Sequence, residues 1–175
     1  STSNIKITTA NNHFETKYYS ITVPPNSGWY QNNDAGESDR LSMSKTVPNH
    51  FYMMIFKTNW LEDEGMKSWT TKRLADNYRR GELVDMIRKG VNTGQFELKD
   101  VVMDEEKVGN KKFYTMNYII AYPNGINQNS YLYLHFPKEK GFTRIFVAIY
   151  QEELDTPKSF KNEFLVALDS LQMAE

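Results

Sequence analysis

The chain has 175 residues, a length that predicts one domain with a core of its own. Lysine and arginine number 21 against 22 aspartate and glutamate, so the net charge of −1 gives no overall field that attracts nucleic acid or an anionic membrane. Cysteine is absent, which excludes disulfides, thiolate metal sites and a thiol nucleophile. No run of about 18 or more apolar residues occurs, so the sequence predicts no transmembrane segment.

The N-terminal residues are polar and turn-prone, and they predict a disordered leader over 1–12 that precedes a single α+β domain over 13–175. Aromatic and β-branched residues over 14–23 predict a strand or a bent pair of strands. Pro24 and Pro25 cannot donate to a β-ladder, so they mark the end of this strand. The polar stretch that follows, SGWYQNNDAGESD, predicts a loop.

Two further strands are predicted at 40–47 and 51–57. The second is apolar almost throughout, which favours a place inside the sheet with cover on both faces. Over 62–91 the apolar residues recur at helical spacing, and we predict two consecutive helices that are broken near Gly81. The adjacent Arg79-Arg80 pair suits the C-terminus of the first helix.

The second half of the chain indicates a meander of antiparallel strands with short turns. Gly109-Asn110 is a two-residue hairpin signal, and 123–125 marks the next connection. Thr156 followed by Pro157 predicts the start of a final helix. The apolar stripe of that helix consists of Phe160, Phe164, Leu168 and Leu171. Because several strands are apolar on both faces, the sequence predicts a three-layer α/β/α sandwich with a central antiparallel sheet.

This order of elements resembles the PsbP-like domain family, whose fold is shared with the eukaryotic Ran-binding release factor and with bacterial lipoproteins. The resemblance covers almost everything from His13 to Met173. Its anchors are the aromatic strand that runs into Pro24 and a Gly28-Trp29 pair, the helical middle, the Gly109-Asn110 hairpin, the FVAIYQEE strand and the closing FLVALDSLQ helix. The resemblance implies a non-enzymatic domain that docks on a larger assembly.

Patterns that carry catalysis or metal binding are weak in this sequence. Ser42 and Lys45 match S-x-x-K, but on a predicted strand two residues at that spacing point to opposite faces. His13, His50 and His135 stand alone, without the spacing that brings two imidazoles to one ion. The glycines match no phosphate-binding loop. We therefore expect neither enzymatic activity nor a cofactor.

Protein binding is the function that these exclusions favour. The loop from Gly28 to Arg40 combines aromatic and acidic residues, a composition common in interfaces. The candidate partner-binding residues are Trp29, Tyr30, Asp34, Glu37 and Asp39. In the alternative arrangement, Trp29 folds back and plugs the end of the sheet. We predict a non-catalytic accessory or protein-interaction domain of an exported bacterial protein, outside the cytoplasm, with a signal peptide or a lipid anchor upstream of residue 1.

A small-molecule or lipid carrier is the alternative function. One face of a predicted strand and one face of its neighbour are lined by Tyr114, Met116, Tyr118, Ile120 and Tyr122, and by Leu132, Leu134 and Phe136. A helix held off this surface leaves an apolar pocket, whereas a helix packed on it makes ordinary core.

Overall fold

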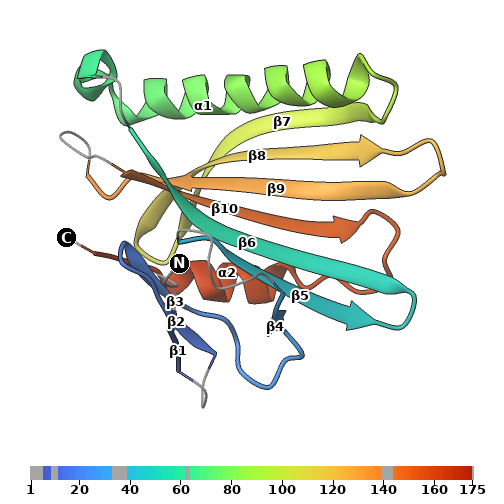
Figure 1. Cartoon of the computed structure of the whole chain (residues 1–175), viewed down its shortest axis with the longest axis horizontal. Helices are drawn as coiled ribbons and strands as arrows, with labels where there is room; N and C mark the ends of the chain where they lie inside the picture. The colour runs from blue at the N-terminus through green and yellow to red at the C-terminus, as the bar shows by residue number, and fades with distance from the viewer. Residues whose placement is uncertain (1–5, 9–11, 33–38, 62–63, 139–143, 175) are drawn as a thin grey trace.

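A large antiparallel sheet forms the centre of the molecule (Figure 1). The structure is a computed structural model that describes residues 6–8, 12–32, 39–61, 64–138 and 144–174. Within these residues, seven strands lie in the order β4-β5-β6-β10-β9-β8-β7. They are β4 (Tyr30–Gln31), β5 (Leu41–Val47), β6 (His50–Trp60), β7 (Glu97–Val108), β8 (Lys111–Ala121), β9 (Asn127–His135) and β10 (Arg144–Glu153).

The position of β6 confirms what its apolar run predicts. It lies between β5 and β10, and Met54 pairs with Met43 on one side and Tyr150 on the other. The predicted hairpin is confirmed as well, because Gly109 and Asn110 join β7 to β8. Gly109 has a φ of +61°, a conformation that glycine adopts without strain.

One face of the sheet is covered by α1, Thr71–Met86, which follows the 3-10 turn η1 (Glu64–Ser68) and continues as the π-helical η2 (Ile87–Val91). Leu74 and Ala75 pack in a cluster with side chains of β8, β9 and β10. The predicted break near Gly81 is wrong, since α1 runs through it. A glycine in a helix costs only about 1 kcal/mol, which packing of the apolar face outweighs. The Arg79-Arg80 pair is therefore in the middle of the helix, not at its end.

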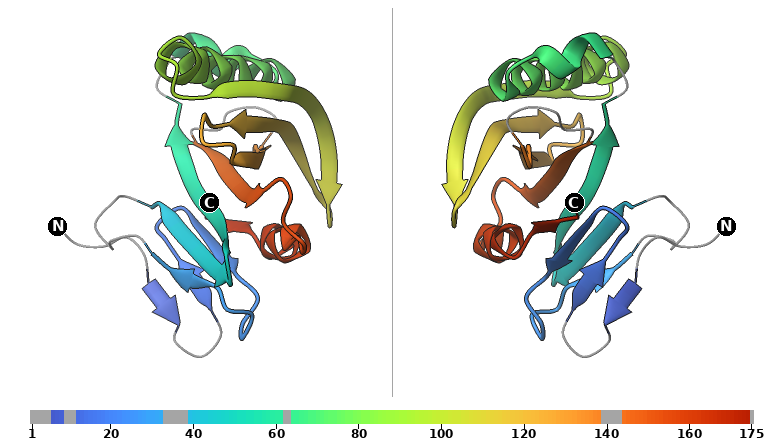
Figure 2. Two further views of the ribbon diagram at one scale, coloured as in Figure 1. Left: turned by 90° about the vertical axis from the view of Figure 1, so that its right-hand side faces the viewer. Right: turned by 90° about the vertical axis from the view of Figure 1, so that its left-hand side faces the viewer.

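The opposite face carries α2, Lys161–Asp169, and a small antiparallel sheet (Figure 2). The predicted stripe of α2 is buried there, in one cluster with the small sheet. The helix begins at Lys161 and not at Pro157, because the Thr156 side chain bonds instead to the Tyr52 hydroxyl and to the carbonyl of Lys158. A second sheet was not predicted.

The small sheet has the order β1-β2-β3-β11. Its strands are β1 (Lys6–Thr8), β2 (His13–Glu15), β3 (Tyr19–Thr22) and β11 (Gln172–Met173). β1 lies within the range predicted as a leader, 1–12, and pairs with β2. β2 and β3 form the bent pair of strands predicted over 14–23. The fold as a whole is mixed α and β, with strands predominating.

Candidate functional site

Trp29 folds back onto the C-terminal helix. Its side chain is 5% exposed, and the indole Nε1 donates a hydrogen bond to Glu163 Oε2 on α2. The ammonium of Lys45 lies 3.2 Å from the same carboxylate oxygen and 3.7 Å from the centre of the Phe160 ring. A buried ammonium needs such compensation, because desolvation disfavours an unpaired charge. The segment after the double proline therefore closes one end of the core.

Asp39 is also inside the fold, at 2% exposure. Its carboxylate accepts hydrogen bonds from the backbone N–H of Thr58, at 3.1 Å, and from the Thr58 hydroxyl. Its carbonyl accepts one from the Tyr19 hydroxyl at 2.7 Å. Burial, together with the charge of Asp39, raises the pKa of Tyr19 far above its usual value. Asp39 thus holds β3, β5 and β6 together.

The candidate partner-binding residues of this loop therefore have different environments in the structure. Trp29 and Asp39 are occupied inside the fold, whereas Tyr30 is 49% exposed on β4. Asp34 and Glu37 lie outside the described residues. These five residues do not form one exposed patch, because the two with buried side chains serve other contacts.

A polar groove of about 400 Å³ lies between the β7 end of the large sheet and α2. We call it the tyrosine–acid groove. Its main groups are Val102, Asp104 and Glu106 from β7, Tyr131 and Tyr133 from β9, and Lys161 from α2. β7 is the outermost strand of the sheet, and nine of its twelve residues are exposed.

The tyrosines of this groove are held by neighbouring groups. Tyr133 donates to Glu106 Oε2, and burial together with this carboxylate raises the pKa of Tyr133 far above its usual value. Burial also raises the pKa of Tyr131, whose hydroxyl accepts from Asn129 Nδ2 at 2.9 Å. Lys161 Nζ lies 4.2 Å from the centre of the Tyr131 ring. Both phenols are therefore neutral at physiological pH and fixed in position before any ligand arrives.

Arg79 links α1 by hydrogen bonds to β7 and β8, two of the strands that line this groove. Its side chain is almost completely buried, and Nη1 donates to the carbonyls of Asp104, at 3.1 Å, and Thr115, at 2.9 Å. Nη2 donates to Asp76 Oδ1 at 2.6 Å. The side chains of Asp104 and Thr115 line the groove. Arg79 thus supports the back of the groove.

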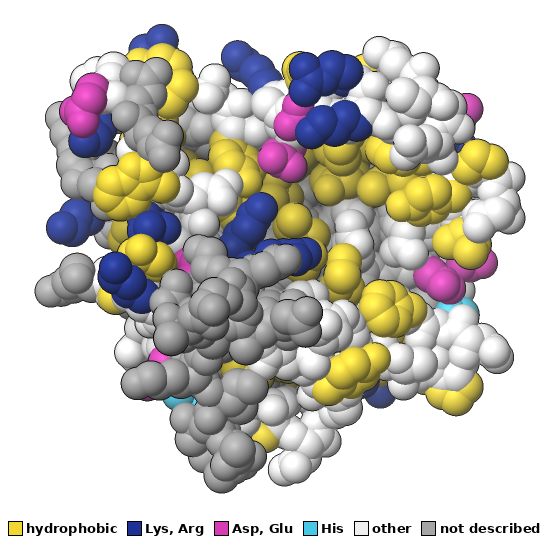
Figure 3. Space-filling view, viewed as in Figure 1, with side chains coloured by type: hydrophobic (Ala, Val, Ile, Leu, Met, Phe, Trp, Pro, Cys, Tyr) yellow, Lys and Arg dark blue, Asp and Glu magenta, His cyan; other side chains and the backbone are white. Residues whose placement is uncertain are grey.

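The apolar stripe considered for a carrier is largely core. Seven of its eight side chains are buried, and they belong to the cluster that contains Leu74 and Ala75 of α1. Tyr122, at 39% exposure, is the exception. Hydrophobic side chains also reach the surface below α1 (Figure 3). Helix packing on the stripe therefore accounts for the residues on which the carrier hypothesis was based.

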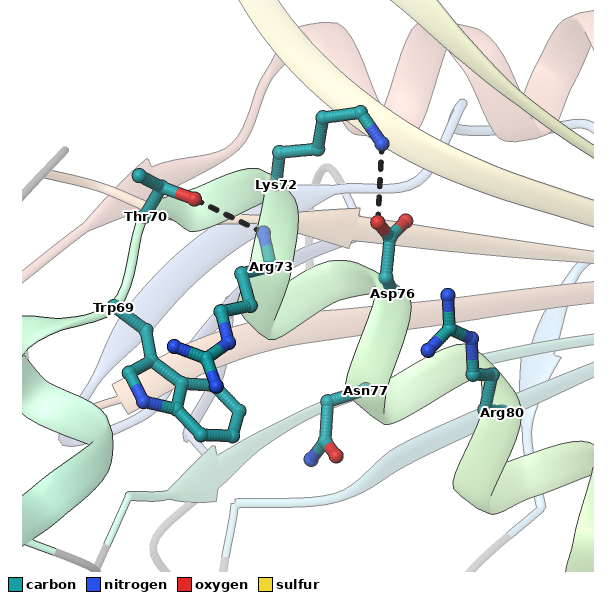
Figure 4. Close-up of a pocket in the computed structure, with 7 residues that line it drawn as sticks. All are labelled: Trp69, Thr70, Lys72, Arg73, Asp76, Asn77 and Arg80. Atoms are coloured by element: carbon teal, nitrogen blue, oxygen red, sulfur yellow. Dashed lines mark hydrogen bonds and ion pairs between the residues drawn. The ribbon is translucent and has the colours of Figure 1, made fainter.

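A second groove, of about 350 Å³, lies on the outer surface of α1 (Figure 4). The Arg73 guanidinium lies 3.7 Å from the centre of the Trp69 ring, at the N-terminal end. Lys72 Nζ is 3.0 Å from Asp76 Oδ2, and this hydrogen bond holds the pKa of Asp76 below its usual value. Arg80 completes the wall and forms no ion pair with a carboxylate among the described residues. We call this the basic groove.

Groups suited to catalysis are dispersed. His13 bonds to Thr22 Oγ1 at 2.8 Å, His50 to Glu153 Oε2 at 2.9 Å, and His135 to the carbonyl of Lys112. Within the described residues, no three His, Asp or Glu side chains are grouped so that they could hold a metal ion. None of the helices that the structure describes is long and apolar enough to cross a membrane.

No protein-family model and no curated protein sequence matches the chain. Among solved structures, a Bacteroides thetaiotaomicron protein is similar with a TM-score of 0.53 and 13% identity, over 90% of this chain and 45% of that one. This chain thus spans less than half of that protein. Cyanobacterial PsbP (CyanoP) from Synechocystis gives a TM-score of 0.51 and 12% identity, over 89% and 86% of the two chains. LpqN of Mycobacterium tuberculosis, involved in cell envelope biogenesis, gives 0.48 and 9%, over 90% and 84%.

These similarities show a PsbP-like fold, as the order of elements predicted. Neither groove was identified from the sequence. Asp104, Glu106 and Lys161 were not among the candidate residues that the sequence indicated. The available signal was the alternation of Tyr131 and Tyr133 with apolar residues on β9, which places both rings on one face.

Proposed function

We propose that the chain is a non-catalytic accessory domain, a three-layer α/β/α sandwich that binds a protein partner through the tyrosine–acid groove and the adjacent edge of β7. The main observation in support of this proposal is a groove with two fixed tyrosines beside an exposed edge strand. Aromatic side chains with fixed polar groups supply most of the binding energy of protein interfaces.

The edge of β7 favours an extended partner segment that adds a strand to the sheet. The ladder between β7 and β8 shifts register between Lys99 and Val102, so the regular part of the edge begins at Val102. Two apolar side chains at the start of this regular part are exposed, Val102 at 55% and Met103 at 39%. In strand addition, main-chain hydrogen bonds supply affinity and side-chain pockets supply specificity.

Charge defines the chemistry of that segment. The groove carries the carboxylates of Asp104 and Glu106 against one lysine, Lys161, while the Glu105 carboxylate pairs with Lys112. Complementary charge steers association and excludes wrong partners. We therefore expect an extended segment with lysine or arginine at alternate positions, placed so that its basic side chains enter the groove.

Selection of peptides from a random phage-displayed library on the purified domain tests this site. We expect enrichment of sequences that alternate basic and apolar residues. A selected peptide, made synthetically, should bind Asp104→Lys at least about fivefold more weakly than the wild type, because like charges now meet. N-methylation of alternate peptide amides should abolish binding by removing main-chain donors.

Glu97→Lys is the matched control, since Glu97 is an exposed acid on the same strand and does not line the groove. Its affinity for the peptide should equal that of the wild type. Selected peptides without basic residues, or equal effects of the two variants, would reject the groove as the binding site.

We also propose an extracytoplasmic location, with a signal peptide or a lipid anchor upstream of residue 1. The resemblance to PsbP-like domains, a fold that includes bacterial lipoproteins, supports this location. Fractionation of cells that express the native gene, followed by immunoblotting, should recover the protein outside the cytoplasm. Recovery with cytoplasmic markers would contradict it.

A further inference from the structure

The surface of α1 that faces away from the sheet has an unusual composition. Residues three or four positions apart share one side of a helix, and five residues of the α1–η2 helix form such a line. They are Arg73, Asn77, Arg80, Val84 and Ile87. The side chains that α1 buries, Leu74, Ala75 and Arg79, lie on the other side. We call the five residues the outer stripe of α1. No carboxylate lies on it.

The outer stripe is positively charged although the whole chain has a net charge of −1. In the described part of the chain, Arg73 and Arg80 form no ion pair with a carboxylate, and Arg73 is stacked on Trp69. The acids beside the stripe are already paired, Asp76 with Lys72 and Arg79, and Asp85 with Arg88. Figure 3 shows lysine and arginine side chains at several points along the top of the molecule, where α1 lies, with acidic side chains beside them.

Two large apolar side chains extend the same stripe. Val84 is 58% exposed and Ile87 43%, at positions where a helix facing water normally carries polar residues. Trp69 precedes the N-cap Thr70 and lines the basic groove, but it is half-buried and packs against the apolar cluster beneath α1, so it does not belong to the stripe. Arginine and aliphatic side chains on one exposed helix face are a combination that lies in the boundary between lipid headgroups and acyl chains.

We propose that the outer stripe of α1 docks the domain on the surface of a bilayer that contains anionic lipids. Arg73 and Arg80 contact lipid phosphates, and Val84 and Ile87 enter the headgroup boundary, with the helix parallel to the membrane plane. Charge complementarity identifies this occupant, because each lysine or arginine near an anionic leaflet adds to affinity. The tyrosine–acid groove lies across the sheet from α1 and remains available to a partner.

Co-sedimentation with vesicles tests the proposal. The wild-type protein should sediment with vesicles of phosphatidylcholine and phosphatidylglycerol and not with phosphatidylcholine alone. Binding should fall as salt rises, because ions screen surface charge. The Arg73→Glu/Arg80→Glu variant should bind at least about tenfold more weakly. Lys17→Glu/Lys107→Glu, which makes the same change in net charge outside α1, should bind more tightly than that variant and close to the wild type.

Val84→Asn/Ile87→Asn, which leaves the charge unchanged, tests insertion separately and should bind the phosphatidylglycerol vesicles more weakly than the wild type. With acyl chains brominated, the tryptophan fluorescence of Val84→Trp should be quenched more strongly than that of the wild type. Circular dichroism confirms that each variant is folded. Failure of the wild type to bind phosphatidylglycerol vesicles, or equal losses in the two charge variants, would overturn the proposal. Binding of inorganic phosphate without vesicle binding would also overturn it, since the basic groove would then hold a soluble anion.

Discussion

The indole Nε1 of Trp29 donates to the carboxylate of Glu163 at 2.5 Å, across 134 residues of sequence. Lys45 reaches the same carboxylate at 3.2 Å, so an aromatic residue and a cation from the first third of the chain share one acid on α2. The two ends of the domain are therefore joined at this point. A residue that composition favours for an interface is instead part of the core.

Trp29→Ala should lower the free energy of unfolding by about 3–5 kcal/mol, because it leaves a cavity and removes a donor from Glu163. Urea denaturation followed by circular dichroism measures this change. Tyr30→Ala is the control, since its side chain is 49% exposed and its loss should cost no more than about 0.5 kcal/mol. Similar costs for the two variants would contradict the buried position of Trp29.

Arg79 and Arg80 are adjacent in sequence, but the first is buried and the second is exposed, so they provide a second matched pair of variants. Arg79→Met keeps the apolar stem but removes the donors to the carbonyls of Asp104 and Thr115, so unfolding should become easier by about 1–3 kcal/mol. Arg80→Met, at an exposed position, should change stability by at most about 0.5 kcal/mol. Urea denaturation at pH 7 compares them. An effect of Arg80→Met as large as that of Arg79→Met would disprove the role of Arg79 in joining α1 to β7 and β8.

Two glycines in the α1–η2 helix should respond in opposite directions to alanine. A Cβ at Gly81 meets no atom within 4 Å, so Gly81→Ala should stabilise by about 0.5–1 kcal/mol through reduced backbone entropy of the unfolded chain. A Cβ at Gly90 would lie 1.9 Å from the Phe96 ring, so Gly90→Ala should destabilise by about 1–3 kcal/mol. Shifts of the thermal midpoint with the same sign would count against this packing.

His135 should make stability depend on pH in the acidic range. Burial lowers the pKa of His135 below its ordinary value of 6.5, although its hydrogen bond to the Lys112 carbonyl opposes this. Between the lowered pKa and 6.5 the unfolded chain binds more protons, so stability is lost as pH falls through this window.

Replacing the histidine should reduce this dependence on pH. The urea midpoint of His135→Gln should fall less between pH 7 and pH 5 than that of the wild type. Gln95→Ala, at an exposed position, serves as the control and should keep the wild-type slope. An unchanged slope in His135→Gln would remove His135 as the cause.

Features that depend on neighbouring residues were predicted well. Alternation and turn residues located the β7–β8 hairpin, and helical spacing identified the buried stripe of α2. Signals of helix ends failed at Gly81 and at Thr156, because tertiary packing extends one helix through a glycine and gives the threonine side chain other partners. The pairing of β1 with β2 was missed since three polar-flanked residues carry no strand pattern.

Neither groove was predicted. The tyrosine–acid groove is assembled from residues that are distant in sequence, whereas the basic groove lies within residues 69–80 and needed only the knowledge of which side of the helix is buried. Lys161 meets Tyr131 and Tyr133 only after α2 packs against the sheet. The outer stripe of α1 became visible once the buried side of the helix was known, whereas a net charge near zero had argued against any anionic surface.

Periodicity along the chain specified which side chains are buried, the antiparallel arrangement of the strands and the PsbP-like order of elements. Contacts between distant segments settled which element covers each face, and therefore whether Trp29, Asp39 and the arginines of α1 lie inside or at the surface. The reason is physical: burial follows from local spacing of apolar residues, but the partner of a polar group is whatever the folded chain brings within hydrogen-bonding distance.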